Sequence, residues 1–246
     1  NGINCQLKYG RKNYDYQEGT ITSFAPGQVV ELEMTETEIN PDVYGLLFHP
    51  DLIRGTALGQ NIRNYGFFAY SSTEALHISE RERNVVMDCL KKISDELNHS
   101  IDKHSRQLIA MNIELLLGYC LRFYERQFTT RELENQNVIQ KFEFLIDEYL
   151  DSCMPQKQGL PSVSYFADKV FLTANYFGDL VKRETGKSAQ EHIQFKLIEK
   201  AKDRIVGTNL TMSEIAYELG FQYPQHFGRL FKRQVGVTPN DYRKQN

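Results

Sequence analysis

The sequence contains no tryptophan, only four cysteines and seven prolines, and no long apolar run. No stretch approaches the roughly eighteen apolar residues that a membrane-spanning helix needs, and the amino end has no basic segment followed by an apolar one. We therefore expect a cytoplasmic protein. The cysteines, Cys5, Cys89, Cys120 and Cys153, lie far apart, which does not fit a disulfide scaffold. Cys89 and Cys120 fall on apolar helix faces, so buried thiols are expected there.

The net charge is −3, and the charged residues are unevenly distributed along the chain. Residues 155–246 contain 14 Lys and Arg against 9 Asp and Glu, whereas residues 1–154 contain 15 against 23. The carboxyl part is therefore basic and the amino part acidic. A basic domain attracts the phosphates on which sequence-independent DNA affinity rests. Charge asymmetry between domains is common, so this observation favours DNA binding only together with a motif.

Such a motif occupies residues 210–243. Thr211 and Glu214 have the spacing of a capping box, which predicts a helix from Met212. Gly220 supplies the permissive backbone at which a helix commonly ends. Pro224 is tolerated in a first helical turn, so a second helix is expected from Tyr223 or Pro224 to about residue 235. Its outer face carries hydrogen-bonding and cationic groups without a carboxylate, which suits the major groove of DNA.

The stretch contains Ile215-Ala216, Gly220-Phe221, Phe227-Gly228-Arg229-Leu230-Phe231-Lys232, Gly236-Val237-Thr238-Pro239 and Tyr242-Arg243. With these residues it resembles the second helix-turn-helix of AraC-type transcription regulators. The resemblance implies a double helix-turn-helix DNA-binding domain and a cupin-like effector domain ahead of it. One departure is Gln225, where the family usually has Ser.

The motif occurs twice in the sequence. Ser162, Phe166 and Ala167 lie 49 positions before Thr211, Ile215 and Ala216. After the turn the offset is 50: Phe177, Leu180, Val181, Lys182, Arg183 and Gly186 precede Phe227, Leu230, Phe231, Lys232, Arg233 and Gly236. The sequence therefore predicts two helix-turn-helix motifs over residues 162–246. Phe171 stands where the second copy has a turn glycine.

Residues 188–206, with apolar side chains at four-residue steps, are expected to form the helix that joins the two motifs. Nineteen residues give about 28 Å, close to one turn of DNA, so one chain can place two helices in successive major grooves. In the resembled family this helix usually has Arg where Leu197 stands, which puts a linker role for that position in doubt.

The candidate DNA-binding residues lie on the predicted outer faces of the two reading helices. We expect specific readout from the second helix through Gln225 and Arg229, and phosphate contacts from the first through Lys182 and Arg183. Arg229 as a phosphate contact, and the basic pairs as solvated helix faces, remain alternatives. The full set is Asn175, Tyr176, Asp179, Lys182, Arg183, Tyr223, Gln225, His226, Arg229, Lys232 and Arg233.

The amino part, residues 1–154, is expected to be an effector and dimerisation domain. Residues 1–78 show strand-like runs such as 19–24 and 28–33, which we interpret as part of a cupin-like β domain that lacks upstream residues. His49 and His77 have no close ligand partner, so no metal or cofactor is expected. Asp51 and Arg54 beside His49 fit a pocket or a solvated loop, the loop being favoured.

Helices are expected over residues 79–151, with a capping box at Ser79 and Glu82. The following helices are predicted at about 103–127 and 132–151. The wide apolar stripe of the 103–127 helix is a candidate homodimer surface, with residues 79–127 as the dimerisation segment. Residues 155–161, which contain Gly159 and Pro161, are expected to form the domain linker.

The fold class expected from these patterns is α+β, with a cupin-like β domain and its following helices ahead of an all-α DNA-binding domain. The leading hypothesis is a regulator that binds double-stranded DNA under the control of a small molecule or partner, with RNA polymerase as a candidate further partner. A regulator whose amino domain only dimerises is the alternative. An enzyme with a DNA-binding tail is disfavoured because no cysteine has an adjacent His or a paired basic group.

Overall fold

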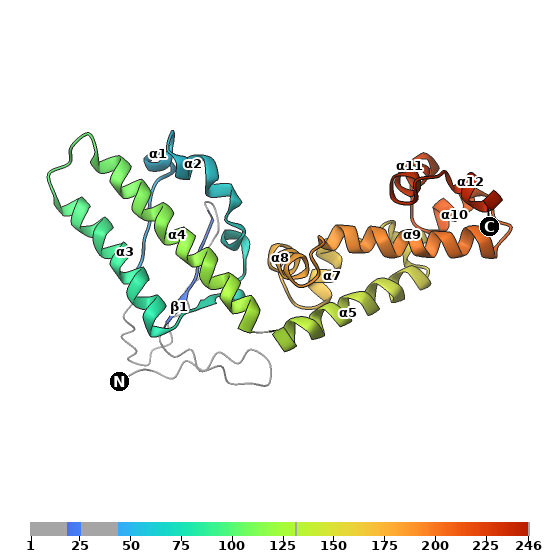
Figure 1. Ribbon diagram of the computed structural model, residues 1–246, viewed down its shortest axis with the longest axis horizontal. Coiled ribbons are helices and arrows are strands. Elements are labelled where there is room, and N and C mark those ends of the chain that lie inside the picture. The colour runs from blue at the N-terminus through green and yellow to red at the C-terminus, as the bar shows by residue number, and fades with distance from the viewer. Residues whose placement is uncertain (1–18, 26–43, 131, 246) are drawn as a thin grey trace. The chain divides into compact units, whose positions relative to one another are not determined.

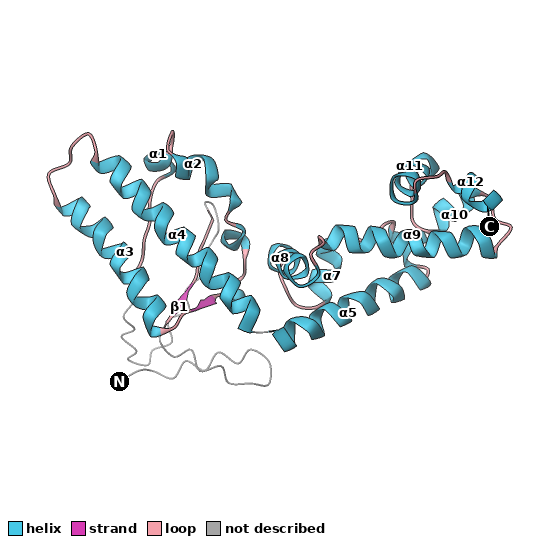
Figure 2. Ribbon diagram, viewed as in Figure 1, coloured by secondary structure: helices cyan, strands magenta, loops and turns pink. Residues whose placement is uncertain are grey.

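The computed structural model describes residues 19–25, 44–130 and 132–245 and divides the chain into two compact regions. The amino-terminal region is Asn1–Thr130 and the carboxyl-terminal region is Arg131–Asn246 (Figure 1). Helices predominate in the described residues, whose two strands form one small sheet (Figure 2). None of the described helices is long and apolar enough to span a membrane.

Two long helices form the centre of the amino-terminal region. α3 (Glu80–Asn98) begins at the expected capping box, in which the Ser79 amide donates to Glu82 Oε2 at 2.9 Å. It packs along α4 (Ser105–Thr130), and side chains of both helices are fully buried between them. Cys89 and Cys120 are among these buried residues, as expected, and burial raises the pKa of the Cys120 thiol to about 12. These thiols belong to the apolar core.

Short helices replace most of the strands expected between residues 44 and 78. α1 (Pro50–Ile53), α2 (Ala57–Asn61) and the 3-10 helices η1 (Ile62–Asn64), η2 (Gly66–Ala69) and η3 (Ser72–Glu74) precede β2 (Leu76–His77). β2 pairs antiparallel with β1 (Thr20–Ile21). The expectation of a strand-rich region is therefore wrong over 44–75. The expected strand at 28–33 lies outside the described residues, and the described part does not confirm a cupin-like barrel.

Local hydrogen bonds explain why this stretch is helical. The Thr56 hydroxyl accepts from the Gly59 amide at 3.2 Å and caps α2. The Arg106 guanidinium of α4 donates to the carbonyl oxygens of Asp51, Leu52 and Arg54, which are the free acceptors at the end of α1. Capping residues and a cation at a helix end stabilise short helices that alternation of side chains alone does not predict.

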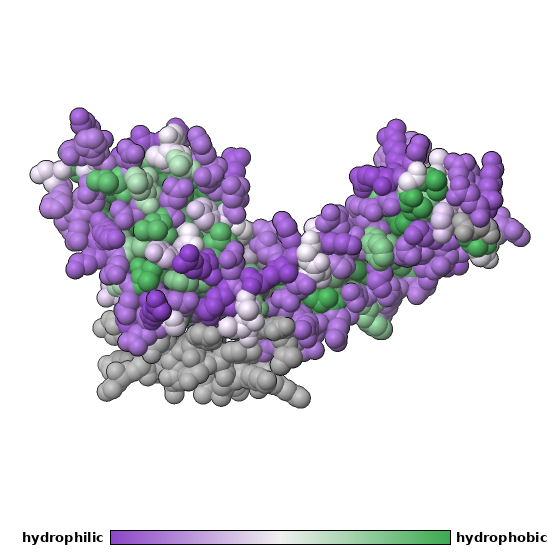
Figure 3. All heavy atoms as spheres, viewed as in Figure 1, coloured by the Kyte–Doolittle hydropathy of each residue, from purple (hydrophilic) through white to green (hydrophobic). Residues whose placement is uncertain are grey.

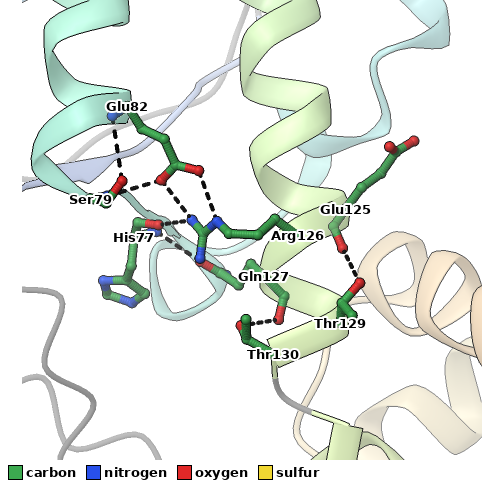
Figure 4. A network of polar contacts seen from close by, with 8 residues as sticks. All are labelled: His77, Ser79, Glu82, Glu125, Arg126, Gln127, Thr129 and Thr130. Carbon is green, nitrogen blue, oxygen red and sulfur yellow. Dashed lines mark hydrogen bonds and ion pairs between the residues drawn. The ribbon is translucent and has the colours of Figure 1, made fainter.

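A polar network ties the last turns of α4 to β2 and to the start of α3 (Figure 4). Arg126 Nε donates to Glu82 Oε1 at 2.9 Å, and its Nη2 donates to the His77 carbonyl at 2.6 Å. Gln127 donates to the Ala75 carbonyl at 3.1 Å and accepts from the His77 amide at 2.8 Å. The Arg126–Glu82 pair is mostly buried, so loss of either partner would leave a poorly solvated charge. The network therefore joins α4 to β2 and α3 through Arg126 and Gln127.

Helix α5 (Glu132–Asp151) belongs to the carboxyl-terminal region, although the sequence grouped it with the amino-terminal domain. Phe142 is fully buried, with its ring 4.9 Å from Phe177 and 5.3 Å from Phe166. Helix α5 belongs to this region because it shares one core with the following helices, in which the aromatic rings bury one another. The expected linker 155–161 is partly helical: α6 (Met154–Gln158) begins there, and Pro155 is buried.

The helices that follow repeat at the predicted offsets. α7 (Val163–Lys169) and α10 (Met212–Glu218) differ by 49 positions at both ends, and α8 (Ala174–Thr185) and α11 (Pro224–Val235) differ by 50. α9 (Ala189–Gly207) connects the two pairs, and α12 (Pro239–Gln245) ends the chain. The duplication is confirmed. We call residues 162–186 the first motif and residues 211–236 the second motif.

Candidate nucleic-acid interface

Both motifs begin at a hydroxyl cap, as expected. In the second, Thr211 Oγ1 accepts from the Glu214 amide at 3.2 Å, and the Thr211 amide donates to Glu214 Oε2 at 2.7 Å. In the first, Ser162 Oγ accepts from the Tyr165 amide at 3.1 Å. Because Tyr165 replaces the carboxylate, the first motif has a single cap bond where the second has a reciprocal pair.

The turns of the two motifs have the same backbone but different residues. Gly220 lies in the left-handed region at φ +89°, and a side chain there would meet Gly159 and Pro155 backbone atoms at 2.8–2.9 Å. Phe171 lies in the same region at φ +60°, which costs a residue with a Cβ about 1–2 kcal/mol. Its ring is 87% exposed, with the Lys141 ammonium 5.7 Å from the ring centroid. The first turn is therefore strained.

Helix α11 presents the cationic face that the sequence predicted. The buried side of the helix is formed by Phe227 and Phe231. The expected contact residues on the opposite side are all exposed: Tyr223, Gln225, His226, Arg229, Lys232 and Arg233. No carboxylate occurs within α11, so nothing on this helix opposes the approach of phosphates. Arg233 also donates to Gln194 Oε1 of α9 at 3.2 Å, which directs its guanidinium toward the connecting helix.

Helix α8 has a different outer face, and one residue expected there is not on it. Asn175, Asp179, Lys182 and Arg183 are exposed. Tyr176 is buried, with 3% of its surface accessible, so its predicted outward position is wrong. Thr173 caps α8, and this start places Tyr176 with Phe177 and Leu180 on the core side. The exposed face of α8 is thus smaller and includes the Asp179 carboxylate.

Helix α9 contacts both α8 and α11, and the two motifs share one hydrophobic core with it. Leu197, which departs from the Arg usual in the resembled family, is 2% exposed and packs in that core. The role of this position is therefore packing. The end of α9 is tied to the last helix, because Arg243 Nε donates to the Ile205 carbonyl at 2.8 Å.

Residues 166–245 match the family model described as "Helix-turn-helix domain". The chain is 34% identical over 79 residues to the uncharacterized transcriptional regulatory protein YesN of Bacillus subtilis, a match that covers 31% of this chain and 22% of YesN. It is 27% identical over 137 residues to the xylose operon regulatory protein of Escherichia coli K12, covering 55% and 33% of the two chains. These residues form an AraC/XylS-type helix-turn-helix domain.

A longer and weaker match extends ahead of the AraC/XylS-type domain. The chain is 21% identical over 188 residues to the uncharacterized HTH-type transcriptional regulator YijO of Escherichia coli K12, covering 76% of this chain and 62% of YijO. Across these three matches the chain spans between 22% and 62% of the length of the relatives.

Sequence reasoning missed the residues of the AraC/XylS-type domain that flank α11. Met212 at the start of α10, and Thr238 and Asn240 at the start of α12, lie beside Gln225, Arg229 and Lys232 along one groove. No signal in the outward spacing of α11 indicates them, because they come from other helices. Only the packing of α10 and α12 against α11 brings them to the same surface.

The two histidines weighed as metal ligands do not come together with others in the described residues. His49 Nδ1 accepts from the Asp51 amide at 3.2 Å and caps α1, while Asp51 pairs with Arg54 at 2.8 Å on the exposed surface. The exposure of this pair favours a solvated surface over a pocket, but the segment is the short helix α1 and not the expected loop. Within the described ranges no group of three or more His, Cys, Asp or Glu side chains could hold a metal ion.

Proposed function

We propose that this chain is a sequence-specific DNA-binding transcription regulator whose two motifs bind one duplex. The main supporting observation is the exposed face of α11, which carries cations and amides but no carboxylate. Such a face provides both phosphate attraction and hydrogen-bond donors for base edges. Helix α9 connects α11 to the first motif, which has the same arrangement of helices. Two of the relatives above are named as transcriptional regulators and the third as an operon regulatory protein, which supports this function.

The connecting helix has a length suited to DNA. α9 contains 19 residues, so it extends about 28 Å, against about 34 Å for a turn of the double helix. Because the two motifs repeat without a symmetry axis between identical chains, a single subunit would read an asymmetric site. Two reading helices on one chain would then occupy successive major grooves.

We propose that α8 and α11 make different kinds of contact with DNA. Gln225 and Arg229 on α11 would contact bases, since an Arg guanidinium donates to N7 and O6 of guanine, and a Gln amide donates to N7 and accepts from N6 of adenine. Lys182 and Arg183 stand in the last turn of α8 and would contact phosphates. Asp179 in the middle of that exposed face makes α8 the weaker reader unless the carboxylate accepts from a cytosine amine.

Selection of duplexes from a randomised DNA pool by the full chain tests the proposal. We expect enrichment of an asymmetric sequence with two elements about one helical turn apart. Lys182→Ala should then reduce the slope of log K against log salt by about 0.9. Failure to enrich any sequence would refute sequence-specific binding, and an unchanged slope would remove Lys182 from the phosphate contacts.

Most of the wide apolar stripe that the sequence offered as a dimer surface, including Ile113 and Leu116, is buried within the amino-terminal region. We propose instead that the dimer surface is another row of residues on α4. Leu108, Met111 and Leu115 are 43%, 56% and 45% exposed and share one helical face, separate from the buried stripe of the helix. Apolar surface is visible among hydrophilic atoms where α4 faces the viewer (Figure 3). A second copy of the chain offering the same stripe would cover it, as two-fold interfaces are self-complementary.

Light scattering of Leu115→Glu and Leu121→Glu tests this surface. Leu121 is 42% exposed on α4 but lies on another face, so it is a matched control. A carboxylate on the stripe should raise the dimer dissociation constant at least about ten-fold, because its desolvation opposes association. The same oligomeric state in both variants and the unmodified chain would argue against the stripe.

We also propose that a small molecule or partner controls DNA binding, and that RNA polymerase is a further partner. The expected test is a change in the selected DNA affinity, and in the unfolding temperature of the full chain, on addition of metabolite mixtures. If dimerisation is retained while neither quantity responds, the alternative of a purely dimerising amino-terminal region is favoured. Cytoplasmic location and the absence of catalysis stay predictions.

A further inference from the structure

An apolar groove runs along one edge of the proposed reading helix. It has a volume of about 410 Å³ and lies where the starts of α10 and α12 flank α11. Apolar side chains of Met212, Pro224 and Pro239 form part of its wall, and Arg229 and Lys232 stand at its cationic edge. None of the residues that line it is acidic.

The carboxylates nearest in sequence accept hydrogen bonds at helix starts, Asp241 from the groove-lining Thr238 and Glu214 from Thr211. At the start of α12 the Thr238 hydroxyl donates to Asp241 Oδ2, and the Asp241 amide donates to Thr238 Oγ1 at 3.2 Å. Glu214 accepts from the Thr211 amide at 2.7 Å. The residues that line the groove thus combine apolar side chains with two cations and no acid, a combination that matches deoxyribose and phosphate in one strand of nucleic acid.

The opposite edge of α11 has different surroundings. Arg233 is directed to Gln194 of α9 by the bond of 3.2 Å, so protein lies on that side. When a helix enters a major groove, the elements beside it meet the sugar-phosphate backbone that borders the groove. The edge lined by Met212 and Asn240 is therefore the one that faces a strand if the proposed DNA binding is correct.

We infer that this groove receives the sugar-phosphate backbone of one DNA strand. Lys232 binds a phosphate by charge, the Asn240 amide donates to a phosphate oxygen, and Met212 and Pro239 contact deoxyribose. Asn240 and Met212 are positioning residues in this arrangement, because the strand seated against them sets how deeply α11 enters the major groove. The inference rests on the proposed DNA-binding function and adds a contact surface that the outward face of α11 does not include.

The experiment compares Asn240→Asp and Asn240→Ala in the full chain on the duplex that the unmodified chain selects. Asn240 is the second residue of α12, where a carboxylate is favourable for helix stability, so Asn240→Asp should fold normally. Gln107→Glu adds the same charge in the exposed first turn of α4 and is the control. We expect Asn240→Asp to weaken binding about ten-fold on cognate and unrelated duplexes, and Asn240→Ala about three-fold.

Neutral methylphosphonates introduced one at a time into the duplex identify the partner phosphate. At one position the neutral linkage should abolish the penalty of Asn240→Asp, because the repulsion then has no second charge. Circular dichroism and thermal unfolding should show both variants folded.

The results of these experiments distinguish failure of the groove assignment from failure of the proposed DNA-binding function. If the unmodified chain selects no duplex, the proposed function fails and the groove assignment fails with it. If it selects one but Asn240→Asp binds within two-fold, or Gln107→Glu loses as much affinity, the groove does not hold the strand although DNA binding stands. If no single methylphosphonate removes the penalty, the groove assignment is likewise overturned.

Discussion

The first and second motifs share a backbone plan but differ in the residues that the plan exposes. Both begin at a hydroxyl cap, and α8 and α11 both end at a left-handed glycine, Gly186 at φ +74° and Gly236 at φ +90°. Between these points the first motif has an exposed Asp179 where the second has Arg229, and a buried Tyr176 where the second has an exposed His226.

This difference shows which positions the fold constrains. Caps, helix ends and core aromatics are kept because a lost cap or core ring destabilises either copy. Exposed positions contribute little to stability and can take the chemistry that each copy needs. The second motif is accordingly the cationic one, and the first tolerates both an acid on its outer face and a strained turn.

The largest expected effect concerns the turn of the second motif. In Gly220→Ala the new Cβ would meet Gly159 and Pro155 backbone atoms at 2.8–2.9 Å, at a φ of +89°. Steric conflict with backbone and a disfavoured φ should lower the free energy of unfolding by about 2–4 kcal/mol. Urea titration measures this. Gly207→Ala, whose Cβ meets open space, is the control, and equal losses in both would contradict the packing explanation.

The next largest effect is expected on DNA affinity, when equivalent positions on α8 and α11 are substituted. Arg229→Ala should weaken binding to a selected site by about 1–3 kcal/mol, with little change on unrelated DNA if Arg229 reads a base. Asp179→Ala, fifty positions earlier, should leave binding unchanged or strengthen it, since a carboxylate is removed from the phosphates. Fluorescence anisotropy on both duplexes measures this. Equal losses for Arg229→Ala on all sequences would make it a phosphate contact.

A smaller effect of opposite sign is expected at the turn of the first motif. Phe171→Gly removes a left-handed strain of about 1–2 kcal/mol, and the greater freedom of glycine in the unfolded chain offsets about 0.5–1 of it. The free energy of unfolding should therefore rise by roughly 0.5–1 kcal/mol. A loss of stability in the same urea titration would mean that the Phe171 ring, which lies near Lys141, contributes more than its 87% exposure indicates.

The smallest effect is a dependence on pH that the second cap has and the first lacks. Bonds from the Thr211 amide and hydroxyl hold the pKa of Glu214 below its ordinary value of 4.5. A lowered pKa in the folded state adds stability above pH 4.5, and this is lost as the pH falls through the folded pKa. Glu214→Gln should unfold at a lower temperature than the unmodified chain at pH 6 and at a similar temperature near pH 3.

A difference between the two proteins that persists undiminished at pH 3 would show that the cap works without the Glu214 charge. Ser162 is followed by Tyr165 at the equivalent position, so Tyr165→Phe should show no such change with pH. Differential scanning calorimetry across this range compares the two caps directly.

Local signals predicted the carboxyl-terminal helices well. Thr211 with Glu214, Pro224 and Gly220 placed the starts of α10 and α11 where the structure has them, because these residues act on backbone groups within four positions. Residues 44–75 were predicted poorly. The end of α1 is held by Arg106, more than fifty positions away, and α2 begins at the Thr56 cap, so the aromatic and β-branched composition alone was misleading.

The sequence by itself determined the duplication, the caps and the cationic face of α11, since each depends on spacing within one or two helical turns. Tertiary structure decided that α5 joins the carboxyl-terminal core, because Phe142 finds its partners on α7 and α8. It also buried Tyr176 and Leu197 and brought Met212 and Asn240 to the edge of α11. These outcomes depend on which faces of distant helices meet, and burial of apolar surface between them settles that.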